Sequence, residues 1–149
     1  MKSGLKSADV LSPVNCVSAT LRRAARTTAR FYDDALRPSG LRTTQFTLLG
    51  ALGTLGEASI GDLSERLAMD GTTLTRNLEI LVRRRFVENV EAEDRRVRNL
   101  RLTGAGTEAF EEAVPLWREA QRQVLDALGP ARWVDVRSKL RKIEAACER

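Results

Sequence analysis

The segment from residue 59 to residue 103 constrains the fold of this chain more than any other part of the sequence. It opens on Ser59-x-x-Asp62, the spacing of a helix N-cap and its reciprocal partner. A three-residue turn, Ala68-Met69-Asp70, follows this short helix, and Asp70 has the side chain of an N-cap for the next helix. Two helices joined by so short a turn are typical of a helix-turn-helix unit.

Two strands are predicted next, Phe86–Val90 and Arg98–Leu102, around a seven-residue loop that carries both acids and arginines. A hairpin after a helix-turn-helix forms a wing, so that one helix can enter the major groove of DNA while the hairpin reaches a neighbouring groove. The segment therefore predicts a winged helix-turn-helix and favours DNA binding over catalysis.

Helices with apolar stripes are predicted on both sides of this segment. One spans about residues 14–36 and a second about 43–55, while a long helix follows the cap Thr103 until Gly129-Pro130 ends it and starts the last helix. The expected fold is mainly α (α+β): four helices, two strands that form the wing, and two further helices. Because long helices must bury their stripes, the outer ones are expected to pack on one another and on a second copy of the chain.

These elements divide the chain into three parts. The first residues are polar and lack the apolar run of a secretory signal, so we expect a loose N-terminus and a cytoplasmic protein. The parts are a flexible N-terminus (1–13), a helical dimerisation region (14–42 and 104–149) and a winged helix-turn-helix DNA-binding domain (43–103).

The location of the charge says more than its total. The net charge is only +5, but residues 71–101 hold eight arginines against five acids. The planar guanidinium suits phosphates and guanine edges, which supports nucleic acid as the partner. A general preference of the genome for arginine would give the same count.

Histidine is absent from the sequence and cysteine occurs twice, at positions 16 and 147. This composition excludes the usual four-ligand zinc site within one chain and the histidine-dependent forms of nucleophile activation. The sequence also has no phosphate-binding loop. Neither an enzyme nor a cofactor or metal is expected.

The second helix of the helix-turn-helix has two different faces. Its apolar face consists of Leu74, Leu78, Leu81 and Val82. Its opposite and flanking positions carry Thr72, Thr73, Thr75 and Arg76. Short hydroxyl side chains allow close approach to base edges, and an arginine reaches guanine with two hydrogen bonds, so these four residues are the predicted DNA readers. The alternative is an ordinary amphipathic surface helix.

The hairpin loop carries the second set of candidates. Arg95 and Arg96 are expected to meet DNA, whereas the carboxylate of Asp94 would repel phosphate and is expected to hold an arginine extended. A solvated hairpin of mixed charge is the alternative.

These motifs occur together with others upstream. The set is Leu36-x-Pro38-x-Gly40-Leu41, Thr44-Gln45-Phe46, Leu63–Leu67, Thr72–Arg76, Asp94-x-Arg96 and Leu100-x-Leu102-Thr103. In combination, over about residues 14–145, they resemble the MarR-type transcriptional regulators. The resemblance implies a homodimer built from the outer helices that binds a pseudo-palindromic operator, commonly as a repressor released by an effector or by oxidation. It places Thr72, Thr73, Thr75 and Arg76 in the major groove and Arg96, with Arg95, in the minor groove, supported by Asp94.

The sequence allows two kinds of signal input. Cys16 lies near the start of the first helix, about two residues before the position at which the peroxide-sensing branch of that family keeps its reactive cysteine. Cys147 could meet Cys16 of a partner chain as a resolving thiol. The tyrosines that hold the thiolate in that branch are replaced by Thr44 and Phe46, and packing of both cysteines as small apolar residues is the alternative. A small organic effector in a cleft lined by Phe31, Phe46 and Trp117 is the second kind, with plain core aromatics as its alternative.

The competing function is a winged-helix module that binds protein and not DNA. Such a module has no need for a basic recognition face, which this sequence keeps in Arg76, Arg95 and Arg96. The sequence therefore favours a homodimeric, sequence-specific DNA-binding regulator.

Overall fold

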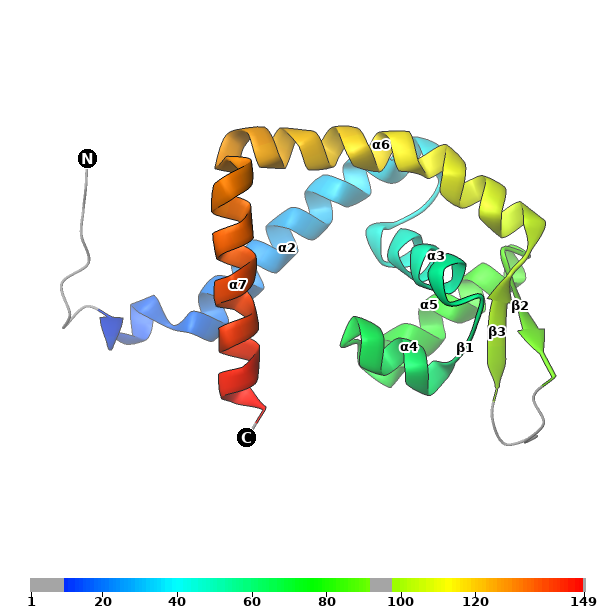
Figure 1. Ribbon diagram of the computed structural model, residues 1–149, viewed down its shortest axis with the longest axis horizontal. Helices are drawn as coiled ribbons and strands as arrows, with labels where there is room; N and C mark the ends of the chain where they lie inside the picture. The colour runs from blue at the N-terminus through cyan, green and yellow to red at the C-terminus, as the bar shows by residue number, and fades with distance from the viewer. Residues whose placement is uncertain (1–9, 92–97, 149) are drawn as a thin grey trace.

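The computed structural model of the protein describes residues 10–91 and 98–148 (Figure 1). Within this part of the chain there are six α-helices, two short 3-10 helices and one three-stranded sheet. In chain order the elements are η1 (Pro13–Asn15), α2 (Val17–Leu36), η2 (Arg37–Ser39), α3 (Thr43–Leu55), β1 (Glu57–Ser59), α4 (Ile60–Leu67), α5 (Gly71–Arg83), β2 (Val87–Val90), β3 (Asn99–Leu102), α6 (Gly104–Leu128) and α7 (Pro130–Cys147). The predicted mainly α, winged helix-turn-helix architecture is confirmed.

The structure adds one strand to the expected order. β1 pairs antiparallel with β3, which also pairs with β2, so the sheet order is β1-β3-β2. Three residues are too few to show an alternating pattern, so the sequence gives no signal for β1. The first helix also begins later than predicted, at Val17 and not near residue 14, because Pro13–Asn15 forms a separate 3-10 turn.

The predicted N-caps are confirmed by their hydrogen bonds. The amide of Asp62 donates to Ser59 Oγ (3.0 Å), and the amide of Ser59 donates in return to Asp62 Oδ2 (2.9 Å). The hydrogen bonds from Ser59 lower the pKa of the Asp62 carboxyl. Thr103 Oγ1 accepts from the amide of Gly106 (3.0 Å), so α6 begins where the sequence predicts. The caps therefore fix where α4 and α6 start.

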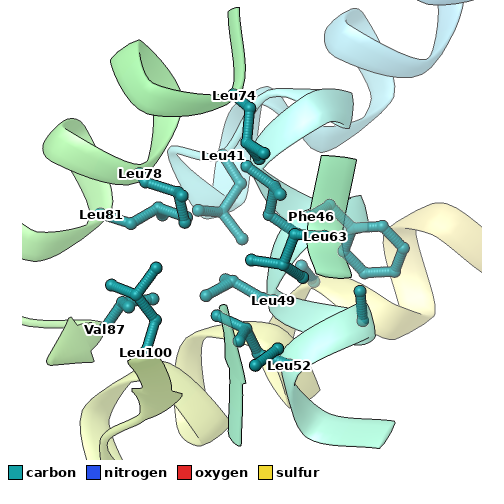
Figure 2. Close-up of a cluster of buried hydrophobic side chains, with 14 of the residues drawn as sticks. Leu41, Phe46, Leu49, Leu52, Leu63, Leu74, Leu78, Leu81, Val87 and Leu100 are labelled. Atoms are coloured by element: carbon teal, nitrogen blue, oxygen red, sulfur yellow. The ribbon is translucent and has the colours of Figure 1, made fainter. Parts of the chain in front are cut away.

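A leucine-rich core lies between α3, the helix-turn-helix and the sheet (Figure 2). Its fully buried side chains include Leu48, Leu49, Leu52, Leu63, Leu74, Leu81, Val87 and Leu100. Figure 2 shows Leu78 and Leu81 of α5 on the same side as Val87 and Leu100 of the sheet. This core fixes how α5 is rolled about its axis, and so which of its side chains face outward.

The outer helices are much less covered. Of the 20 residues of α2 only Leu36 is buried, and α7 buries none of its 18 residues. α6 leads from the winged lobe to these helices, and α7 folds back after Gly129, which has a φ of 89° (Figure 1). α2 and α7 thus leave exposed apolar side chains, Val17, Phe31 and Val134 among them. The core, in contrast, gathers mainly within the winged lobe, the part of the chain from α3 to β3, and also takes in Leu36, Leu41 and Ala113 from the flanking segments.

The turn between α4 and α5 contains a residue under backbone strain. Ala68 ends α4 at φ 49° and ψ 41°, in the left-handed region that disfavours every residue with a Cβ except in short turns. Ala68→Gly should therefore raise the free energy of unfolding by about 0.5–1 kcal/mol, measured by urea titration. Ala105→Gly, at an exposed helical position of α6, should lower it. Equal losses in both variants would contradict the strain at Ala68.

Candidate nucleic-acid interface

The orientation of α5 presents the predicted reading residues to the outside. Asp70 Oδ1 accepts a hydrogen bond from the amide of Thr73 (2.9 Å), which caps the helix and lowers the pKa of this carboxyl. Leu74, Leu78 and Leu81 are buried on the inner face. The outer positions follow from helical geometry: Thr72, Thr73 and Arg76 are exposed and Thr75 is half-buried.

These side chains line a shallow depression on the surface of α5. It has a volume of about 490 Å³ and is lined by Gly71, Thr72, Thr75, Arg76 and Glu79. Three of the four predicted readers therefore share one surface, while Thr73 is exposed beside the N-cap. Gly71 and Glu79 were not singled out from the sequence. Helical spacing alone places Glu79 one turn beyond Thr75 and Arg76 and could have identified it.

Asn77 is a further polar residue of α5, at a half-buried position. Its side-chain amide donates to the carbonyl of Thr73 (2.9 Å), one turn earlier in the helix. The bond uses one of the two N–H donors of this amide, and asparagine is a side chain suited to adenine.

The base of the wing is held by polar bonds across all three strands. Arg101 of β3 donates from Nε to Glu88 Oε1 of β2 (2.7 Å), and its Nη1 lies 3.7 Å from Glu57 Oε1 of β1. Arg98 also donates to the side chain of Asn89. These exposed contacts join the side chains of the strands that carry the hairpin. Asp94, Arg95 and Arg96 themselves lie outside the described residues.

Both cysteines are free and exposed in the single chain. Cys16 is the N-cap residue of α2 and Cys147 is the last residue of α7. Figure 1 shows the start of α2 and the end of α7 on the side of the molecule away from the sheet. Neither thiol is packed within the chain itself. The single chain therefore does not bury the two cysteines as small apolar core residues.

The structure brings together two of the three aromatic residues predicted for an effector cleft. Phe46 stacks on Trp117, with ring centroids 5.8 Å apart, and on Phe110, at 4.8 Å. Phe46 is only 8% exposed, so this stack belongs to the core between α3 and α6.

Phe31 lies elsewhere, in an open apolar groove between α2 and α6. The groove has a volume of about 630 Å³ and is lined by Thr27, Thr28, Phe31, Gln123, Val124, Ala127 and Leu128. Phe31 contacts the ring of Tyr32 edge-on, and Tyr32 donates a hydrogen bond to Gln121 of α6. The sequence could not separate Phe31 from Phe46, because both stand at apolar helix positions.

Two negative findings concern the described part of the chain, residues 10–91 and 98–148. None of its helices is both long and apolar enough to cross a membrane. It also contains no cluster of three or more cysteine, aspartate or glutamate side chains that could hold a metal ion.

Comparisons with known proteins identify the class. The chain is 38% identical to the transcriptional regulator MosR of M. tuberculosis, whose crystal structure in complex with DNA aligns over 90% of this chain and 99% of MosR with a TM-score of 0.78. BpsR of Bordetella bronchiseptica is 28% identical over 90% of this chain and 97% of its own, with a TM-score of 0.79. YwoH of Bacillus subtilis, an HTH-type transcriptional regulator, is 27% identical over 62% of this chain and 67% of its own length.

The winged fold and these relatives define a DNA-binding transcriptional regulator, and the relatives are not enzymes. The family model of the MarR family matches residues 39–97, which include the helix-turn-helix and the first strand of the hairpin, β2. The chain belongs to the MarR family.

Proposed function

We propose that this protein is a homodimeric repressor that reads a pseudo-palindromic operator with α5 of each chain. The observation that carries the proposal is the outer face of α5, where Thr72, Thr75 and Arg76 stand together above a fully buried leucine face. The known complex of MosR with DNA supports this assignment.

The proposed contacts follow from the chemistry of these side chains. Arg76 is long enough to donate two hydrogen bonds to one guanine, while Thr72, Thr73 and Thr75 bond to base edges or phosphates at shorter range. Arg95 and Arg96 of the hairpin are proposed to enter the minor groove, with Asp94 holding the loop in shape. A protein-interaction module would leave this basic face without a role.

The homodimer is inferred from surface that one chain leaves uncovered. Val17 is 56% exposed, Phe31 38% and Val134 68%, and they lie on α2 and α7. Apolar stripes on long helices are stable in water only when another surface covers them, and a two-fold dimer supplies that surface from the same helices. Dimerisation also places two copies of α5 side by side, as a palindromic operator requires.

Val17→Asp should weaken this dimer. Asp at the first position of α2 is favourable for the free helix, because it meets the positive end of the helix dipole, so the single chain should fold normally. At a dimer interface the same carboxylate is buried without a partner, which should raise the dimer dissociation constant about a hundredfold. Sedimentation equilibrium measures this constant.

Leu55→Asp, at a 37% exposed position of the winged lobe, is the control and should leave the dimer intact. An unchanged constant for Val17→Asp would place the interface elsewhere.

Release from DNA is proposed to occur through a small organic effector or through an oxidant. The open groove at Phe31 offers an apolar site of suitable volume, and the DNA binding of BpsR is regulated by 6-hydroxynicotinic acid. The exposed thiols of Cys16 and Cys147 offer the second route, through a disulfide between the two chains.

One experiment tests the proposed function and separates the two routes. A fixed amount of operator duplex is titrated with the protein in static light scattering, and a complex of two chains per duplex is expected. The preformed complex is then treated with an organic hydroperoxide or with 6-hydroxynicotinic acid. If the peroxide releases the wild type from DNA but not Cys16→Ser, the redox route is assigned. If 6-hydroxynicotinic acid releases the wild type but not Phe31→Ala, the effector binds in the groove at Phe31. A single chain per duplex would contradict the homodimeric function.

A further inference from the structure

We propose that Arg84 is a positioning residue that sets the angle between the winged lobe and the dimerisation helices, and thereby the half-site spacing that the dimer accepts. The inference rests on the proposed homodimeric function and adds to it the residue that selects operator geometry.

Arg84 links the end of α5 to the elbow between α2 and α3. It is the C-cap residue of α5, and its Nη1 donates a hydrogen bond of 2.7 Å to the carbonyl of Gly40. Its guanidinium carbon also lies 4.5 Å from the centre of the Phe86 ring. A charge-assisted bond and a cation–π contact thus hold one planar group between two parts of the chain that are 44 residues apart.

The elbow itself is shaped to receive this arginine. Gly40 has a φ of 69°, and its amide donates to the carbonyl of Arg37 (2.9 Å), which closes the short turn η2. A Cβ at this glycine would lie 3.3 Å from Nη2 of Arg84, tighter than most contacts of that kind. The close approach and the left-handed backbone together explain why glycine stands at this position.

The residues that follow Arg84 hold the second connection between lobe and dimerisation helices. Arg85 has a φ of 61°, and its carbonyl accepts a hydrogen bond of 2.6 Å from Thr103 Oγ1, the cap of α6. The amide of Thr103 donates to the carbonyl of Phe86 (3.1 Å), and Gly106 packs on that same carbonyl. Residues 84–86 therefore contact both places where the chain passes between the winged lobe and the outer helices.

This placement has a consequence for DNA binding. In a dimer the outer helices form the shared interface, and the α5 helix of each lobe binds one half-site. The two half-sites are separated by about one helical turn of DNA. A rotation of the lobe at the α2–α3 elbow changes the separation of the two α5 helices. Since Gly40 lies at this elbow, the bond from Arg84 limits that rotation. Arg84 is exposed, so its loss should relax the angle without unfolding the lobe.

The test is a panel of operators in which single base pairs are added or removed between the half-sites. The wild type should prefer one spacing, and in Arg84→Ala the affinity ratio between the best spacing and its neighbours should fall about tenfold, the equivalent of one charge-assisted hydrogen bond. Arg84→Lys keeps a donor and a cation and should restore part of the preference. Arg118→Ala, which removes the same charge from an exposed site on α6, should leave the spacing profile unchanged.

Two results would overturn the inference. An equal loss of affinity at every spacing, with a shallower dependence on salt, would make Arg84 a phosphate contact. A spacing profile in Arg84→Ala identical to that of the wild type would leave the residue without a positioning role.

A second measurement needs no DNA and separates this inference from the proposed function. Spin labels are attached at Thr20→Cys on α2 and Glu65→Cys on α4 of the full chain, with Cys16→Ser and Cys147→Ser, and labelled chains are diluted in a large excess of unlabelled ones. The distribution of distances between the labels should broaden in Arg84→Ala and narrow again in Arg84→Lys. If the distance distribution of Arg84→Ala equals that of the wild type, Arg84 has no positioning role. If the wild-type protein binds DNA that lacks two half-sites equally well, only the proposed function is contradicted.

Discussion

Gly106→Ala should lower the free energy of unfolding by about 3 kcal/mol or more, because no room exists for a methyl group at this position. A Cβ on Gly106 would lie 1.9 Å from the carbonyl oxygen of Phe86 and 2.8 Å from its carbonyl carbon. Both are backbone atoms, so they cannot move away by a rotation about side-chain bonds, as the end of a flexible side chain can. The start of α6 must therefore move away from Phe86.

That movement breaks other bonds of the same junction. The amide of Gly106 donates to Thr103 Oγ1 (3.0 Å), and Thr103 in turn bonds to the carbonyls of Arg85 (2.6 Å) and Phe86 (3.1 Å). Loss of an N-cap alone costs about 1 kcal/mol, which adds to the cost of the overlap. The variant should also bind DNA poorly, since this junction joins the lobe to the dimerisation helices.

Urea unfolding of Gly106→Ala and Gly104→Ala provides a matched comparison. Gly104 lies in the same turn of α6, but a Cβ there would meet no heavy atom within 4 Å. Gly104→Ala should therefore leave the stability unchanged or raise it by about 0.5–1 kcal/mol, through the lower conformational entropy of alanine in the unfolded chain. Similar stabilities for the two variants would show that α6 does not rest on Phe86 as described.

Arg76→Ala should have the largest effect on recognition. The expected loss is about 1–3 kcal/mol of operator binding, together with relaxed specificity at one base pair per half-site. This loss is expected because Arg76 is proposed to make a bidentate contact with guanine, the kind of contact that distinguishes this base pair from the other three. Since Arg76 is exposed on a helix whose inner face is buried, the fold should not change.

The measurement is a binding titration of Arg76→Ala on the operator, on single-base variants of each half-site and on random DNA. Thr75→Ala should cost less, because a hydroxyl makes one hydrogen bond where the guanidinium makes two. Arg118→Ala on α6 controls for the loss of one positive charge. An equal loss on operator and random DNA would assign Arg76 to the phosphate backbone and remove it from base recognition.

The helices and the hairpin of the winged lobe could be predicted because each has a local cause. Ser59, Asp70 and Thr103 cap helices through side chains that lie within three residues of their partners. The buried and exposed faces of α5 follow from helical periodicity alone, so its outer face was predicted correctly. β1 was missed because a three-residue strand depends on its pairing with β3, which is distant in the sequence.

The contacts between lobe and outer helices could not be predicted, because they join residues that are far apart in the chain. Nothing near Arg84 in the sequence indicates that it reaches Gly40, and nothing near Gly106 indicates the carbonyl beneath it. The aromatic residues show the same limit. Phe31 and Phe46 occupy similar apolar helix positions, yet one borders an open groove and the other a buried stack.

The central claim, that the outer face of α5 reads a specific operator, is tested most directly by fluorescence anisotropy. The reduced protein is titrated against the DNA upstream of its own gene and against a scrambled duplex of equal length and composition, at matched salt. The account predicts tight binding to the upstream DNA, with a preference of at least about a thousandfold over the scrambled duplex. Equal affinity for both duplexes, falling in parallel as salt is raised, would contradict it.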